Sequence, residues 1–176
     1  MPRLAFAFVL RRLRSPSLRF LFIFCAAALF GFAFEVIPWV NEHGIQPFIT
    51  GLAWLAGGLI RLLGGWADVT EAVIRHPGNG FAIKIANGCS GLEAVILLAA
   101  GVLAFPATWS ERALGWMAGA AAIMMLNVLR VMSLYYIGQY SREWFDWAHL
   151  YAWDVLIMID GPVSYTHLTL PTNREV

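Results

Sequence analysis

The stretch "LRFLFIFCAAALFGFAFEVIPWV", residues 18–40, is the first long apolar run of the chain and decides the class of fold. A helix needs roughly 20 apolar residues to cross the hydrocarbon core of a bilayer, and this run is long enough. It is too long for the apolar region of a signal peptide, and no small-x-small cleavage site follows it. We therefore predict a retained membrane span over Leu18–Val40, with Glu35 and Pro38 near its far end.

The rest of the chain extends this prediction to a protein with several spans. Of the 176 residues, 60% are hydrophobic and 13% are charged, and the mean hydropathy is +0.67. These values exclude an ordinary soluble domain of this length. Further apolar runs cover 92–107, 113–137 and 149–159, of which the last stops early. The predicted fold is an all-α, multi-pass membrane helical bundle.

The N-terminal flank sets the predicted orientation. A basic arm of this kind could bind nucleic acid, but an apolar run follows it directly. The positive-inside rule therefore favours a cytoplasmic N-terminus over residues 1–17, with the membrane domain covering 18–161. The first nineteen residues hold no acidic residue and five arginines: Arg3, Arg11, Arg12, Arg14 and Arg19.

The segment Phe48–Leu63 has two interpretations. Its apolar residues recur at helical spacing on one side, while polar and small residues occupy much of the other. We favour an amphipathic helix in the membrane interface, although the pattern leaves a full crossing open. After it, "HPGNG" (76–80) predicts a turn and "FAIKIA" (81–86) a short strand. The apolar stripe consists of Ile49, Leu52, Ala53, Ala56, Leu59, Ile60 and Leu63.

The order of helices and loops brings three reactive side chains to one side of the membrane. If 48–63 does not cross, the segment before Ser90 lies outside and the following helix runs inward. The loop "PATWSER" (106–112) then turns at the cytoplasmic side, and "GQYSREWFDWA" (138–148) is predicted to be an outer loop. These side chains would share a side even if 48–63 crossed, because the connections among them are unchanged; they are Cys89, Arg130 and His149.

The stretch "IANGCSGLEA" (85–94) places a cysteine just before a predicted helix. Ser90 and Glu93 fit the capping box [ST]-x-x-[DE], so in the plainest interpretation Cys89 merely precedes a helix cap. A thiol beside a helix N-terminus, however, meets the positive end of the helix dipole, which favours the nucleophilic thiolate. Neighbouring glycines such as Gly91 leave room for a substrate backbone. We interpret Cys89 as the nucleophile.

Arg130 lies inside the predicted span 113–137, where a charged side chain is costly and usually faces a partner or a polar cavity. Asn127, three residues earlier, lies on the same helix face. An arginine near the outer interface could instead extend its guanidinium group to the headgroups. The functional interpretation is that Arg130 stabilises a carbonyl oxyanion or binds a substrate carboxylate.

His149 begins the last apolar run on the same side as Cys89. It could accept the thiol proton as a general base and return it to a leaving amine. Asp146, three residues earlier, is the nearest acid that could orient the imidazole. The spacing leaves open Asp154 and Asp160 as the orienting acid, and His43 and His76 as the base.

The two cysteines, Cys25 and Cys89, are expected at different depths, so we predict no disulfide between them. No cysteine and histidine cluster has the spacing of zinc ligands. We therefore expect neither a metal nor another cofactor.

Three motifs in this order, "NGCSGLE" (87–93), "NVLR" (127–130) and "HLYAW" (149–153), resemble the exosortase/archaeosortase family. The compact size is most similar to the exosortase H type. The resemblance extends over roughly residues 18–160, and the combination is far more specific than any single motif. It implies a multi-pass protein of the bacterial inner membrane that acts as a cysteine transpeptidase, without a cofactor and with its active site on the periplasmic side.

The resemblance also implies site residues and partners. In this family the cysteine, arginine and histidine of the motifs are the proposed catalytic set, here Cys89, Arg130 and His149. The implied substrates are exported proteins with a C-terminal sorting signal, made of a short motif, a transmembrane helix and a basic tail. For the H type, that motif is similar to Ile-Pro-Thr-Leu. Our candidates for substrate-binding or supporting residues are Asn127, Ser90, Gly91, Glu93 and Asp146.

The implied reaction begins with attack of Cys89 on a backbone carbonyl, and a thioester then passes to an amine or to water. The bilayer is the other expected partner, and nucleic acid is not expected. A different class of function also fits the sequence: a non-catalytic membrane scaffold or assembly factor, in which Cys89 only starts a helix. A transporter is disfavoured because so few spans leave little room for paired repeats.

The end of the chain departs from the family. Residues 162–176, which end in "VSYTHLTLPTNREV", are polar and unrelated to the preceding sequence. They resemble a translated sequencing-adaptor read-through. We expect this tail to be non-native and exclude His167 from the site.

Overall fold

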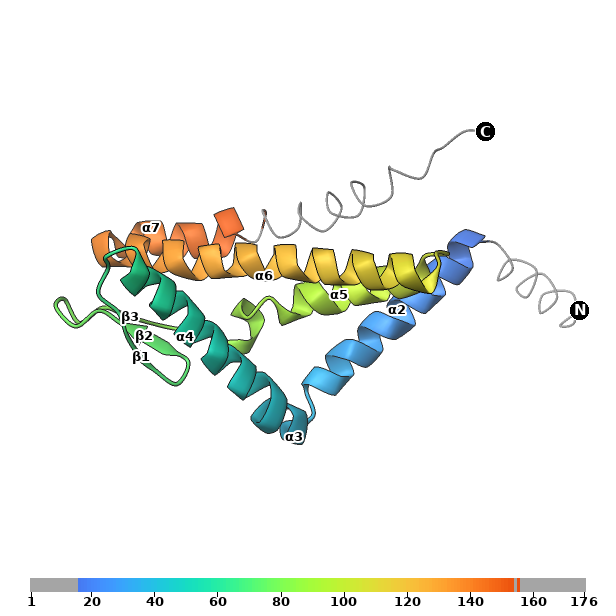
Figure 1. Cartoon of the computed structure of the whole chain (residues 1–176), viewed down its shortest axis with the longest axis horizontal. Coiled ribbons are helices and arrows are strands. Elements are labelled where there is room, and N and C mark those ends of the chain that lie inside the picture. The colour runs from blue at the N-terminus through green and yellow to red at the C-terminus, as the bar shows by residue number, and fades with distance from the viewer. Residues whose placement is uncertain (1–15, 154, 156–176) are drawn as a thin grey trace, which may run out of the picture.

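A computed structural model describes residues 16–153 and 155, and these residues are mostly helical (Figure 1). Within these residues, three stretches are long and apolar enough to cross a membrane, namely Pro16–Glu35, Pro38–Leu62 and Trp109–Tyr140. The prediction of an all-α, multi-pass membrane protein is confirmed, with the addition of one small sheet. Most of the basic N-terminus, part of the last apolar run and the tail 162–176 lie outside the described residues.

Helix α2 (Pro16–Glu35) packs along α5 (Leu92–Ala104). Gly31 permits the close approach, because a Cβ atom there would overlap the side chain of Ile96. The first span was predicted to reach Val40 but ends at Glu35. Ile37, which precedes a proline, is extended (φ −62°, ψ 123°), as steric contact with the proline ring requires, and the chain changes direction there.

The chain continues through α3 (Pro38–Val40) and a π-helical segment (Asn41–Ile45) into α4 (Gln46–Leu62). In Figure 1, α2 and α4 diverge from α3 like the arms of a V. Most of the apolar stripe predicted for this segment is buried: Ile49, Leu52, Ala53, Ala56 and Ile60 are at most 6% exposed.

The buried stripe of α4 contacts protein, chiefly α6 and the sheet. The opposite face is exposed yet carries Trp54 and Leu55, so it is not a polar face turned to water. The amphipathic pattern therefore corresponds to a face that is buried in the protein, and the interfacial location of this helix stays a prediction. By length and composition, the stretch Pro38–Leu62 is able to cross a membrane.

A three-stranded antiparallel sheet lies between α4 and the cysteine motif, in the order β1 (Asp68–Thr70), β2 (Val73–Arg75), β3 (Ala82–Lys84). Val69 pairs with Ile74, and Ile74 pairs with Ile83. The strand predicted over 81–86 is confirmed as β3, whereas β1 and β2 were not predicted. The stretch 68–75, which holds both strands, lacks the six-residue alternation seen over 81–86.

The turn predicted at 76–80 joins β2 to β3. His76 Nδ1 accepts hydrogen bonds from the amides of Gly78 (3.0 Å) and Asn79 (3.2 Å), and Asn79 Oδ1 accepts one from the amide of Phe81 (2.9 Å). Gly80 has φ +72°, a conformation that favours glycine. The side chain of His76 thus serves the turn.

Helix α6 (Trp109–Tyr140) is the longest element and starts with a capping box formed by Thr108 and Glu111. Its 32 residues rise about 48 Å, more than the roughly 30 Å of hydrocarbon in a bilayer. The helix breaks at Ser141, and α7 (Arg142–Trp147) folds back beside its C-terminal end (Figure 1). The outer loop predicted over 138–148 is therefore mainly helical.

Gly138, near the end of α6, has no side chain and so allows the sheet and α7 to pack closely against this helix. A Cβ atom at Gly138 would overlap the ring of Phe81 from the sheet side and lie 3.0 Å from Cδ2 of Phe145 in α7. Gly115, on the same helix, has no atom within 4 Å of such a Cβ. A larger side chain would therefore clash with its neighbours at Gly138, whereas the space around Gly115 is empty.

We expect Gly138→Leu to destabilise the protein by about 1–3 kcal/mol through overpacking, while Gly115→Leu stays close to wild type. The measurement is the midpoint of thermal unfolding in detergent for both variants. Equal midpoints for the two leucine variants would contradict the packing shown here.

Candidate active site

Cys89 ends a short 3₁₀ turn, Asn87–Cys89, that follows β3. The turn is closed by backbone hydrogen bonds from Cys89 N to Ala86 O (3.0 Å) and from Ser90 N to Asn87 O (3.1 Å). The Asn87 side chain also anchors it, because its Oδ1 accepts a hydrogen bond from Gln46 Nε2 at the start of α4 (3.0 Å). Cys89 is half-buried at the end of this anchored turn.

The predicted capping box at Ser90 and Glu93 is wrong in register. The N-cap of α5 is Gly91, which has φ +78°, and no side chain caps the helix there. Ser90 is fully buried and holds the turn instead: its hydroxyl donates to Asn87 O (2.7 Å) and accepts from Leu92 N (3.3 Å). Glu93 is exposed in the first turn of α5.

The space at Gly91 is filled by α6. A Cβ atom there would lie 2.8 Å from Cε of Met124 and 3.2 Å from Cγ of Asn127. The expectation that Gly91 leaves room for a substrate backbone is therefore wrong. Asn127 is 2% exposed, and its amide atoms have no hydrogen-bond partner among the described residues. It packs against Gly91, next to the turn that holds Cys89.

His149 lies in a π-helical segment, Ala148–Ala152, that continues α7. Its ring stacks on that of Phe145, one turn earlier, with 5.8 Å between centroids and 3° between planes. Nε2 of His149 is 3.3 Å from Sγ of Cys89, although sixty residues separate them along the chain. The predicted juxtaposition of these two side chains is present.

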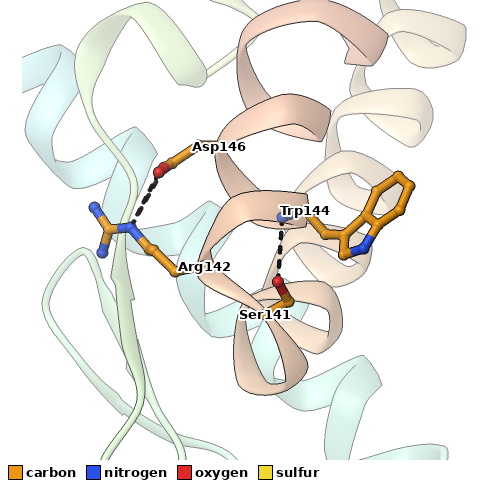
Figure 2. Close-up of polar contacts among 4 residues, drawn as sticks. All are labelled: Ser141, Arg142, Trp144 and Asp146. Atoms are coloured by element: carbon orange, nitrogen blue, oxygen red, sulfur yellow. Dashed lines mark hydrogen bonds and ion pairs between the residues drawn. The ribbon is translucent and has the colours of Figure 1, made fainter.

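Asp146 does not orient His149 in the described structure. Its carboxylate forms an ion pair with Arg142 one turn earlier, with 3.3 Å between Nε and Oδ1, as Figure 2 shows. Figure 2 also shows Ser141 accepting a hydrogen bond from Trp144 N at the start of α7. Both ends of the ion pair are exposed, so solvent screens it. Asp154 and Asp160 lie outside the described residues.

Arg130 completes the cluster from α6. It is 5% exposed and, together with Cys89 and His149, lines a small pocket that opens to solvent. Among the described residues that line it, Arg130 and Lys84 are cationic, and a cation beside a reacting carbonyl favours a developing negative charge. The other lining residues are Ile83, Lys84, Ile85, Val131, Leu134 and Phe145.

The competing histidines do not line this pocket. His43 is exposed and stacks on Trp39, and His76 is bound in the turn before β3. Cys25 is exposed on α2. Within 16–153, no group of three or more His, Cys, Asp or Glu residues has the geometry to hold a metal ion.

Three residues of the site were not identified from the sequence. Lys84 brings a second cation, Phe145 supports the imidazole and Gln46 anchors the cysteine turn. A signal existed for Phe145, which is four residues before His149 and thus on the same helix face. Gln46 and Lys84 act through contacts between distant segments, for which a single sequence has no local signal.

The chain was compared with known proteins. The family model described as transmembrane exosortase (Exosortase_EpsH) matches residues 2–159. A curated relative, an undecaprenyl-diphosphatase of Cupriavidus necator, is 31% identical over 64 residues, which are 36% of this chain and 22% of the relative. The aligned part is therefore about a fifth of that protein's length. No solved structure gives a significant match.

The family match covers every residue that the structure describes, including the turn with Cys89, helix α6 with Arg130 and the segment with His149. It agrees with the resemblance inferred from the three motifs. The chain belongs to the transmembrane exosortase family.

Proposed function

We propose that this protein is a cysteine transpeptidase that cleaves C-terminal sorting signals of exported proteins through a thioester on Cys89. The observation that carries the proposal is the 3.3 Å separation between Cys89 Sγ and His149 Nε2. A thiol and an imidazole within hydrogen-bond reach form the nucleophile and base pair of cysteine acyl transfer. The location of Arg130 in the same pocket supports it further.

In the proposed reaction, the Cys89 thiol transfers its proton to His149 Nε2 while Sγ forms a bond to the substrate carbonyl carbon. Arg130 stabilises the negative charge that develops on the carbonyl oxygen. The carbon–nitrogen bond then breaks, and the proton on His149 passes to the leaving amine. An incoming amine or water attacks the thioester, gives its proton to His149 and releases Cys89 as a thiol.

The proposed substrates carry a short motif similar to Ile-Pro-Thr-Leu, a transmembrane helix and a basic tail. The resemblance to the exosortase H type supports this choice. The basic N-terminal flank supports placing the protein in the bacterial inner membrane with its pocket on the periplasmic side. A helix anchored in the same bilayer would bring its preceding motif to the membrane surface, where the proposed pocket opens.

The thioester can be tested in a Cys25→Ser background, which leaves Cys89 as the only cysteine. Membranes with this variant and a tripartite candidate substrate are treated with hydroxylamine, which attacks thioesters. We expect cleavage, a substrate hydroxamate as product and, without hydroxylamine, an acyl adduct on the peptide that contains Cys89. A mass spectrum and a gel shift report both.

Two outcomes would overturn the proposal in different ways. Cleavage without a hydroxamate or a Cys89 adduct would exclude the thioester. The absence of cleavage across a panel of tripartite substrates would favour the scaffold interpretation. An impermeant maleimide applied to intact spheroplasts checks the orientation, because it should label Cys89 without lysis.

A further inference from the structure

Strand β3 forms one end of the sheet, so one of its two backbone edges pairs with β2 and the other pairs with no strand of the described structure. Ala82 and Lys84 are exposed along it. An unpaired strand edge offers a row of amide and carbonyl groups to any extended chain that approaches. This edge lies five residues before Cys89.

The hydrogen bonds of β3 show which backbone groups face outward. Phe81 O accepts from His76 N (2.8 Å), and Ile85 N donates to Ala72 O (2.9 Å), so the odd-numbered residues face β2. In an antiparallel ladder, the amide and carbonyl of one residue both point to the same edge of the strand, and those of the next residue both point to the opposite edge. The amide and carbonyl of Lys84 therefore face the unpaired edge.

The pocket adjoins this same edge. Ile83, Lys84 and Ile85 all line it, and they are consecutive. Side chains alternate between the two faces of a sheet, so a pocket on one face would be lined by every second residue. Three consecutive lining residues place the pocket beside the strand at its edge, and the other edge is occupied by β2.

We infer that the substrate's sorting motif binds as an additional strand on the unpaired edge of β3, with backbone hydrogen bonds to the amide and carbonyl of Lys84. This inference rests on the proposed function. Strand addition holds a peptide extended by main-chain hydrogen bonds, while pockets select alternate side chains. It would present successive carbonyls beside Cys89, and the apolar lining from Ile83, Ile85 and Phe145 would favour apolar side chains at every second position of the motif.

The test compares Lys84→Pro with Lys84→Ala, which both remove the charge. Only the proline also removes the outward amide, and a proline is tolerated on a strand edge where that amide makes no ladder bond. We expect Lys84→Pro to process the tripartite substrate at least about tenfold more slowly than Lys84→Ala, with a raised KM. Labelling of Cys89 and the unfolding midpoint check that the proline variant is folded.

A second measurement does not depend on the proline variant. Synthetic substrates with one N-methylated amide each are scanned through the motif with wild-type protein. Pairing on one edge predicts that methylation at alternate positions blocks cleavage. Equal rates for the two Lys84 variants, or a scan without period two, would overturn the strand addition. Failure of the proposed function is distinct, since wild type would then cleave no substrate.

Discussion

Alanine in place of Cys89, of His149, or of both should reduce cleavage by a similar large factor, about 10⁴ or more. The 3.3 Å contact makes the two side chains one unit, because the imidazole activates the thiol and the thiol is the group that reacts. Removing either member removes the acyl transfer. The second substitution then has little left to remove, so the effects should not add.

The measurement is the initial rate of substrate cleavage per mole of membrane-inserted protein for the two single variants and the double variant. His149→Ala retains the thiol, so its residual rate should rise with pH, because hydroxide must then remove the proton that the imidazole removes in wild type. Cys89→Ala should show no such rise.

Two matched controls exist on the same chain. Cys25→Ala and His43→Ala each remove the same kind of side chain from an exposed position away from the pocket, so both should cleave at close to the wild-type rate. If Cys89→Ser cleaves as well as wild type, or if the double variant loses the product of the two single losses, the paired roles are wrong.

Substitution of Arg130 by leucine should slow cleavage by about 10²–10³, the usual effect of removing one donor to a developing oxyanion. The side chain is 5% exposed and lines the pocket with Cys89 and His149, so little solvent is available to replace it. Arg130→Lys should recover part of the rate, since an ammonium group supplies the charge without the planar set of donors.

The kinetic constants separate the roles considered for Arg130. An oxyanion donor acts in the transition state, so kcat falls while KM changes little. A group that binds a substrate carboxylate would chiefly raise KM. An arginine that only reaches the headgroups would change neither. Equal labelling of Cys89 in wild type and Arg130→Leu checks that the pocket is preserved.

Much of the site could be predicted because it depends on topology and chemistry. The order of the apolar runs placed Cys89, Arg130 and His149 on one side, and the structure brings them into one pocket. The supporting contacts were harder to predict. Asp146 has the right spacing for His149 but pairs with Arg142, since α7 is helical and both (i, i−4) and (i, i+3) neighbours compete for it.

The remaining differences between the sequence patterns and the observed packing have a common physical origin. The Ser90 and Glu93 pattern predicts a cap, yet packing of Gly91 against Asn127 and Met124 accompanies a helix start two residues after Ser90. The stripe of α4 has the period of a helix with one buried side, but a period does not specify what covers that side. In both cases the outcome depends on a distant segment.

By itself, the sequence determined the class of fold, the candidate nucleophile and the family, because hydropathy and short motifs are local properties. Only the tertiary structure decided that α4 faces a protein core, that Phe145 stacks on His149 and that residues of β3 line the pocket. Each of these depends on contacts between segments far apart in the chain, and those contacts arise when apolar faces pack and backbone groups pair across the fold.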